Sequence, residues 1–281
     1  MAGESRPFRV LSLGAGLDST TLLLLSEHGE VPRLDAAIFA DTMAEPAYVY
    51  ETLEWLMATV RIPIYRVSAG NLEADILAVA ASQEKLTAGF RGQPPFYVQN
   101  APNLDYATAD SGGTLWRKCT KDYKIAPIRG KIRELLGAQS TGRLPKGLHV
   151  EQWIGFTMDD LGRTFCSDVQ WITNVFPLIL PKRMRRRDCE RWLVKHGYPV
   201  PQKSSCVFCP YHRNSYWRDM RDNRPAEWHR AVEFERQLHA GHLPGVRGTP
   251  YLHKSLVPLP MAPIDAVESG NEELFCYACN T

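Results

Sequence analysis

The first part of the chain alternates between short apolar runs and segments with one apolar face, a pattern typical of strands followed by helices. The predicted elements are strands over 8–13, 36–40 and 63–67 and helices over 18–27, 46–60 and 71–81. Strands that alternate with helices imply a parallel sheet with helices on its faces. We therefore predict an α/β fold, with a parallel-sheet, Rossmann-like (HUP-type) nucleotide domain.

The pattern changes after residue 81. Residues 88–115 are rich in Gly, Pro and Asn without periodicity, and we interpret this segment as a lid over a substrate. The later predicted elements are a helix over 123–136, strands over 150–156 and 174–179, a basic helix over 182–196 and a helix over 215–240 interrupted near Pro225. We divide the chain into a nucleotide-binding domain, 1–180, and a smaller helical C-terminal part with cysteine pairs, 181–281.

A glycine-containing turn, Gly14-Ala15-Gly16-Leu17-Asp18-Ser19-Thr20, joins the first strand to the first helix. A strand, a small turn and a helix N-terminus in this order make an anion pocket, because backbone N–H groups and the helix dipole favour negative charge. A Walker A loop is excluded, since the turn holds no lysine, and a dinucleotide fingerprint is weak, since Ser19 replaces its third glycine. An ordinary strand-to-helix turn stays open beside a nucleotide site at 13–20.

The turn is similar to the pyrophosphate loop, Ser-Gly-Gly-x-Asp-Ser, with Gly14 and Ala15 in place of the first two residues. Further motifs follow in family order: Phe39-Ala40-Asp41-Thr42 with Glu45-Pro46, Arg117-Lys118-Cys119-Thr120 with Tyr123 to Ile128, Ile154-Gly155-Phe156, and Ser205 to Tyr211. Together they resemble the PAPS reductase-like branch of the pyrophosphate-loop (PP-loop) ATP pyrophosphatases, the adenine nucleotide alpha-hydrolase superfamily.

This resemblance implies an AMP-forming enzyme that uses ATP and Mg²⁺ to adenylate an acceptor, releases diphosphate and then transfers sulfur. The nucleotide-binding residues it implies are Leu13, Gly14, Ala15, Gly16, Asp18, Ser19, Thr20, Phe39, Asp41 and Gly155. The predicted catalytic residues are Asp18, Lys124 and Arg163, because attack on the α-phosphate develops negative charge that cations stabilise. Asp18 or Asp41 would help hold Mg²⁺. For Arg163, a salt bridge to a neighbouring aspartate stays open.

Cysteines form the second candidate site. The pair Cys206-x-x-Cys209 lies among prolines and serines, and this spacing on a turn is typical of zinc and iron–sulfur sites. In relatives that reduce adenylylsulfate, a Cys-Cys pair joins a later C-x-x-C around a [4Fe–4S] cluster. Here that place reads Cys119-Thr120, so one ligand is missing. We predict Cys276 as the fourth, and Cys189 and His212 stay open as alternatives. Zn²⁺ held by the pairs 206/209 and 276/279 is the alternative.

Charge and composition exclude few partners. The net charge is +2, but a basic stretch over 182–195 predicts either a solvated helix face or a grip on phosphate. No apolar run approaches the roughly 20 residues that a membrane span needs, and the N-terminal residues hold no apolar secretion segment. We therefore expect a cytoplasmic protein with reduced thiols, a nucleotide as ligand, and a nucleic-acid substrate or a sulfur-donor protein as partner.

Two other functions fit the same motifs. A sulfonucleotide (PAPS or adenylylsulfate) reductase would use a C-terminal cysteine as nucleophile, although the Glu-Cys-Gly context of those enzymes is absent around Cys276. A nucleotide- or nucleic-acid-binding module without catalysis would keep the pocket and lose the chemistry. The sequence leaves the acceptor and the oligomeric state open.

Overall fold

The computed structural model describes residues 6–82, 90–98, 113–138, 148–246 and 248–266. Five parallel strands form the central sheet in the order β3-β2-β1-β6-β7. Its strands are β1 (Phe8–Leu13), β2 (Ala36–Asp41), β3 (Ile64–Ser68), β6 (Val150–Ile154) and β7 (Ile172–Val175). The predicted α/β, Rossmann-like fold is confirmed.

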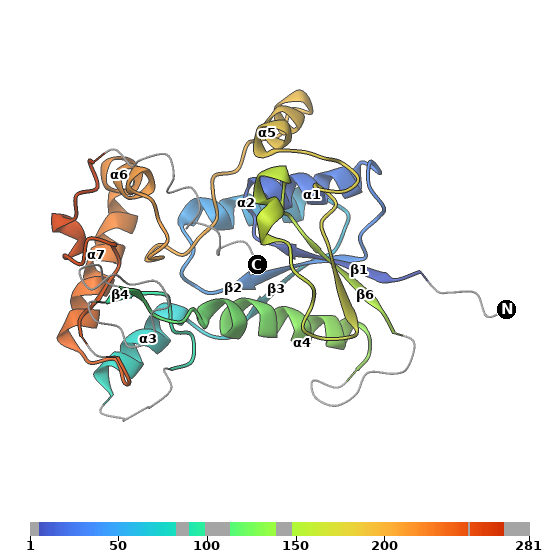
Figure 1. Cartoon of the computed structure of the whole chain (residues 1–281). Coiled ribbons are helices and arrows are strands. Elements are labelled where there is room, and N and C mark those ends of the chain that lie inside the picture. The colour runs from blue at the N-terminus through green and yellow to red at the C-terminus, as the bar shows by residue number, and fades with distance from the viewer. Residues whose placement is uncertain (1–5, 83–89, 99–112, 139–147, 247, 267–281) are drawn as a thin grey trace.

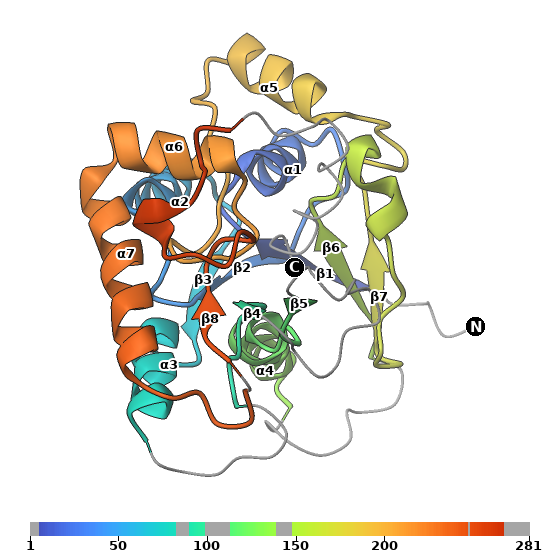
Figure 2. The ribbon, with the colours of Figure 1, turned by 60° about the vertical axis from the view of Figure 1, so that its left-hand side comes forward.

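Helices cover both faces of this sheet, and the C-terminal helices extend past its end (Figure 1). The α-helices are α1 (Leu17–Glu27), α2 (Ala47–Thr59), α3 (Leu72–Ala81), α4 (Ala126–Leu135), α5 (Arg186–Lys195), α6 (Asn214–Asn223) and α7 (Pro225–Ala240). Helices α1 and α2 lie on one face of the sheet and α4 on the other, while α5 lies outside α1 (Figure 2). The central strands are thus covered on both sides, which explains why β2 is buried along its whole length.

Two apolar clusters follow from these layers. On the α1 face, sheet residues such as Leu11 and Phe39 pack with leucines of α1 and α2 and with Cys189 of α5. On the α4 face, Ile128 and Ile132 pack against Val10 and Ile38 of the strands. The four consecutive leucines of α1 are all buried, because this helix is covered by the sheet on one side and by α5 on the other.

The largest apolar cluster combines residues from both sides of position 181. Apolar residues of α3 pack there with residues of α6, α7 and the segments that follow. A small antiparallel sheet, β5-β4-β8, joins the same regions, with β4 (Tyr97–Val98), β5 (Gly113–Thr114) and β8 (Pro250–Tyr251). Residues 90–98 and 113–115 of the predicted lid therefore belong to this packed region, and 99–112 lie outside the described residues.

Several element boundaries in the second half of the chain differ from the sequence prediction. The strand predicted over 150–156 ends at Ile154. The strand predicted over 174–179 ends at Val175, because the backbone turns there and the amides of residues 179 and 180 both donate to the Phe176 carbonyl. The basic helix begins at Arg186 and not at 182, since the Arg185 amide donates to the Asp188 carboxylate at 2.9 Å and so marks the helix start. Shorter elements are a π-helix over Lys121–Ile125 and 3₁₀ turns over Met158–Arg163 and Leu259–Met261. Within the described part of the chain, no helix is both long and apolar enough to cross a membrane.

Candidate nucleotide site

A pocket of about 540 Å³ lies where the strand order reverses, at the carboxyl ends of β1 and β6. The glycine turn after β1, 14–19, and Gly155 after β6 line it, and we call it the loop pocket. At such a switch point the loops that leave the two neighbouring strands run to opposite faces of the sheet, and a crevice is left between them. In parallel α/β sheets, ligands bind in this crevice. The fold alone therefore makes this pocket the candidate binding site.

The turn is shaped to present backbone amides to the pocket. Ala15 has a left-handed conformation with φ 55°, and the Gly14 amide donates to the Ser19 hydroxyl oxygen at 3.2 Å. Gly16 occupies the N-cap position of α1, where it has no side chain to accept from the first-turn amides. These amides and the positive end of the helix dipole are consequently left for an anionic ligand.

Three glycines allow the pocket walls to approach one another closely. A Cβ atom at Gly155 would lie 2.8 Å from the Ser19 backbone nitrogen, so the end of β6 packs directly on the first turn of α1. A Cβ at Gly16 would lie 3.2 Å from the Ser204 nitrogen, and one at Gly14 3.1 Å from the Ser204 hydroxyl oxygen. Residues 201–204 thus cover the glycine turn, a contact between segments about 190 positions apart in sequence.

Asp18 is the buried carboxylate of the loop pocket. One of its oxygens, Oδ2, lies 3.5 Å from the Arg186 Nε, while Oδ1 is buried without a hydrogen-bond partner among the described residues. Burial raises the pKa of Asp18 to about 7, an effect that the Arg186 charge only partly offsets. An orphaned buried carboxylate oxygen of this kind accepts either a proton or a metal cation, so Asp18 fits the Mg²⁺ that accompanies a nucleotide.

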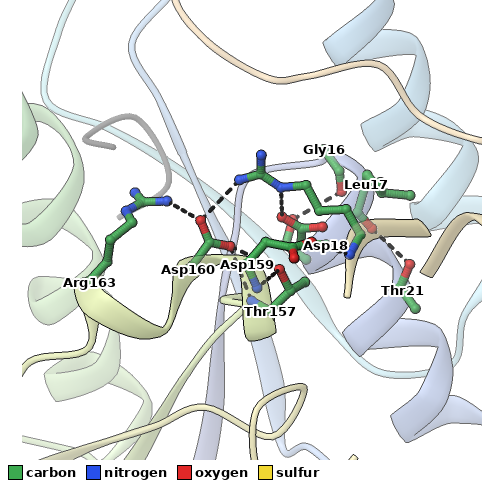
Figure 3. Close-up of polar contacts among 10 residues, drawn as sticks. Gly16, Leu17, Asp18, Thr21, Thr157, Asp159, Asp160 and Arg163 are labelled. Carbon is green, nitrogen blue, oxygen red and sulfur yellow. Dashed lines mark hydrogen bonds and ion pairs between the residues drawn. The ribbon is translucent and has the colours of Figure 1, made fainter. Parts of the chain in front are cut away.

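Asp160 organises the cations beside Asp18 (Figure 3). Its Oδ1 accepts from Arg163 at 2.6 Å and from Arg186 at 3.0 Å, and its Oδ2 accepts from the Thr157 amide and hydroxyl. Asp160 is fully buried, so both arginines are held by a rigid partner. Arg163 therefore forms the salt bridge that the sequence left open, and it does not line the loop pocket, whereas Arg186 does.

The C-terminal part supplies pocket residues that sequence reasoning missed. Lys203 and Arg213 line the loop pocket as further cations, and Tyr216 and Asp219 line it from α6. The Tyr216 hydroxyl lies 2.9 Å from that of Tyr48, which donates to the Lys203 carbonyl. No local signal marks these residues, because they reach the glycine turn only through the packing of α6 and of residues 201–204.

The predicted cysteine ligands line a second, smaller pocket of about 40 Å³, which we call the cysteine pocket. Cys119, Cys206 and Cys209 lie there together with Lys124. Burial raises the pKa of the Cys206 thiol, whose Sγ lies 3.4 Å from the Thr42 hydroxyl. Lys124 is paired with the buried Glu45 at 3.2 Å, so it lies with the cysteines and away from the loop pocket.

These three cysteines do not by themselves make a metal site. Among the described residues, no three His, Cys, Asp or Glu side chains are placed to hold a metal ion, and Cys276 and Cys279 lie outside those residues. The described cysteines thus do not fit a cluster or a zinc ion unaided.

The other predicted nucleotide residues lie beside the loop pocket without lining it. Leu13, Ala15, Thr20 and Phe39 are buried in the sheet and the first helix turns. Asp41 accepts from Arg66 at 2.6 Å and from the Tyr50 hydroxyl at 2.9 Å, and burial together with this bond raises the pKa of Tyr50. Five predicted residues do line the pocket, namely Gly14, Gly16, Asp18, Ser19 and Gly155.

Comparison with known proteins gives one structural neighbour of interest. No family model matches the chain, and no curated protein matches it. Among solved structures, it is similar to phosphoadenylyl-sulfate (PAPS) reductase from Candida auris, crystallised as a phosphate complex. The similarity has a TM-score of 0.39 and 13% sequence identity, and it covers 71% of this chain and 78% of that one.

Proposed function

We propose that the chain binds ATP with Mg²⁺ in the loop pocket and adenylates an acceptor with release of diphosphate. The observation that supports this most is the uncapped N-terminus of α1 opening into a pocket at the switch point of the sheet. A helix N-terminus with side-chain-free residues before it binds phosphate through backbone amides. The pocket volume of about 540 Å³ is within the range for small-molecule ligands.

The buried carboxylate and the three cations of the loop pocket each have a role in this proposal. The backbone amides of Gly16 to Ser19 bind phosphate oxygens, and Asp18 holds Mg²⁺ through its orphaned oxygen. Arg186, Lys203 and Arg213 neutralise the remaining phosphate charge. When bound, Mg²⁺ stabilises the charge on the transferring and leaving phosphates. Arg163 contributes as a positioning residue, because it bonds to Asp160, which also holds Arg186.

The reaction has two substitutions. An oxygen of the acceptor attacks the α-phosphorus of ATP, the bond from that phosphorus to the bridging oxygen of diphosphate breaks, and the acceptor proton passes to solvent. A sulfur nucleophile, supplied as a thiolate or hydrosulfide by a donor, then attacks the activated carbon, and AMP leaves with the acceptor oxygen. Positioning and electrostatic stabilisation by the pocket residues support the first substitution.

The proposed transfer of sulfur is supported by the position of three cysteines in the cysteine pocket. Cys119, Cys206 and Cys209 lie in one place, and Cys276 is our proposed fourth ligand for a [4Fe–4S] cluster, or part of a zinc site. Iron, zinc and acid-labile sulfide content of protein purified without oxygen tests this directly. About four irons with matching sulfide support a cluster, and about one zinc indicates a structural site.

The test of the proposed function is nucleotide binding and turnover by matched variants. Asp18→Asn should weaken ATP–Mg²⁺ binding, whereas Asp168→Asn, at an exposed carboxylate paired with Arg129 away from the loop pocket, should bind like the wild type. Diphosphate and AMP release are measured across nucleic-acid and small-molecule acceptors. Sulfite release from PAPS with a dithiol reductant would favour the reductase instead. A wild-type protein that binds no ATP contradicts the proposal.

A further inference from the structure

The basic charge of this chain is concentrated in one segment. Residues 182–195 hold seven basic and two acidic side chains, whereas the whole chain has a net charge of only +2, so acidic residues are in excess elsewhere. Most of this segment is helix α5, which protrudes from the body of the molecule outside α1 (Figures 1 and 2). The positive charge therefore projects from one edge of an otherwise mildly acidic protein.

Helix α5 divides into a packed face and a basic face. Cys189 and Leu193 are buried against α1, whereas Arg187, Arg191 and Lys195 are exposed. We call these three the α5 stripe. They follow one another at intervals of four residues, so successive charges lie on one face with a rise of about 6 Å. Among the described residues, Arg191 is the one member of the stripe with a carboxylate oxygen within 4.0 Å, that of Asp188 at 3.7 Å, and the Arg191 side chain is still 70% exposed.

The helix that carries the α5 stripe also borders the loop pocket. Arg186 and Glu190 of the same helix line that pocket, and Lys203 and Arg213 add positive charge to its wall. An extended polyanion lying along the stripe would thus have one end at the site that is shaped for phosphate. The one exposed apolar residue of the helix is Val194, so the face lacks the apolar surface by which amphipathic helices enter membranes.

We propose that the α5 stripe binds the sugar-phosphate backbone of a nucleic-acid strand and leads a nucleotide of that strand to the loop pocket. That the stripe binds a strand follows from the spacing of its charges. That the strand leads a nucleotide to the loop pocket rests on the proposed function. Backbone contacts position a strand without reading its sequence. The ring centroid of the neighbouring Trp192 lies 4.0 Å from that of His196, and its Nε1 donates to the Glu30 carboxylate. The Trp192 ring is thus engaged within the protein and is not offered to a base, so we expect binding that does not depend on sequence.

The test is the salt dependence of nucleic-acid binding by a charge-removed variant, Arg187→Gln/Arg191→Gln/Lys195→Gln. Binding to labelled single-stranded RNA, single-stranded DNA and duplex DNA is measured by fluorescence anisotropy at salt concentrations between about 50 and 200 mM. On a single strand, each phosphate that the protein neutralises releases about 0.7 counterions. Removal of three contacts should lower the slope of log K against log salt by about 2 and weaken binding by tenfold or more at the low salt end.

A control variant removes the same charge elsewhere. Arg33→Gln/Arg61→Gln/Arg236→Gln changes three exposed arginines away from α5 and should bind nucleic acid like the wild type. Thermal melting checks that both variants fold. The proposal is overturned if the stripe variant binds nucleic acid as tightly as the wild type does. It is also overturned if the wild type binds polyglutamate as tightly as nucleic acid and the stripe variant loses that binding. ATP affinity is measured separately and should be the same in the stripe variant and the wild type. If the wild type binds nucleic acid through the stripe but binds no ATP, the proposed function is refuted and the proposal of nucleic-acid binding by the stripe stands.

Discussion

Gly155→Ala is the substitution that tests the packing of the loop pocket most sharply. The added Cβ would lie 2.8 Å from the Ser19 nitrogen, 2.9 Å from the Ser19 Cα and 3.1 Å from the Asp18 carbonyl carbon. All three are backbone atoms of the first turn of α1, so no flexible side chain can move aside. Either α1 or the end of β6 must shift by several tenths of an ångström to accept the methyl group.

The cost of this shift follows from overpacking. Extra methyl groups forced into a packed interior cost about 1–3 kcal/mol, which for a chain of this size lowers the melting temperature by roughly 2–12 °C. The shift also displaces the amides that we assign to phosphate. Loss of one charge-assisted hydrogen bond of about 1.5–3 kcal/mol weakens nucleotide binding by about tenfold or more. Stability and nucleotide affinity should therefore fall together.

Gly130→Ala is the matched control, because a Cβ at this helical position of α4 meets no atom within 4 Å. It should raise stability by about 0.5–1 kcal/mol through the helix preference of alanine and leave nucleotide affinity unchanged. Thermal unfolding and calorimetric titration with ATP–Mg²⁺ give both quantities. A Gly155→Ala protein that melts and binds like the wild type would refute the close packing of β6 on the glycine turn.

Three further substitutions test other buried groups. Because burial raises the pKa of Asp18 to about 7, the folded state keeps a proton there that the unfolded state loses near pH 4, so this group's contribution to stability falls as pH rises from about 4 to 7. Asp18→Asn should remove that loss, so urea unfolding should show a larger gain in stability over the wild type at pH 8 than at pH 5. Lys124→Met should destabilise by about 3 kcal/mol or more by leaving Glu45 unpaired, and adding Glu45→Gln should restore most of it in the same unfolding assay. Glu235→Ala should destabilise by about 1–3 kcal/mol, because two buried backbone amides lose their acceptor, with faster hydrogen exchange at those amides as the readout.

The sequence predicted the sheet well because the apolar pattern of its first part is unambiguous. The strands and helices up to residue 81 are found within one residue of their predicted ends, and the all-buried run of β2 leaves no alternative face. Predictions failed where a boundary depends on one contact. The basic helix starts late because the Asp188 carboxylate bonds the backbone three residues before it, which periodicity does not report.

The candidate site was harder to predict, because a motif locates residues along the sequence and does not show which side chains they contact in the folded chain. Asp18 and Gly155 could be named because they stand in motifs that resemble the PP-loop family, and both line the loop pocket. Asp41 stands in such a motif too, at the end of β2, but Arg66 of the neighbouring strand pairs with it, and only the fold brings that arginine close. For Arg186 the sequence left a solvated helix face and a grip on phosphate open, and the α1–α5 packing directs its side chain to Asp18.

Hydrogen exchange with and without ATP–Mg²⁺ tests the central claim most directly, because it reports which backbone amides the nucleotide covers. The account predicts slower exchange at residues 14–19, the glycine turn and the first turn of α1, whose amides have no side-chain cap. Protection confined to another part of the chain, or no change at residues 14–19 at saturating nucleotide, would contradict the assignment of the loop pocket.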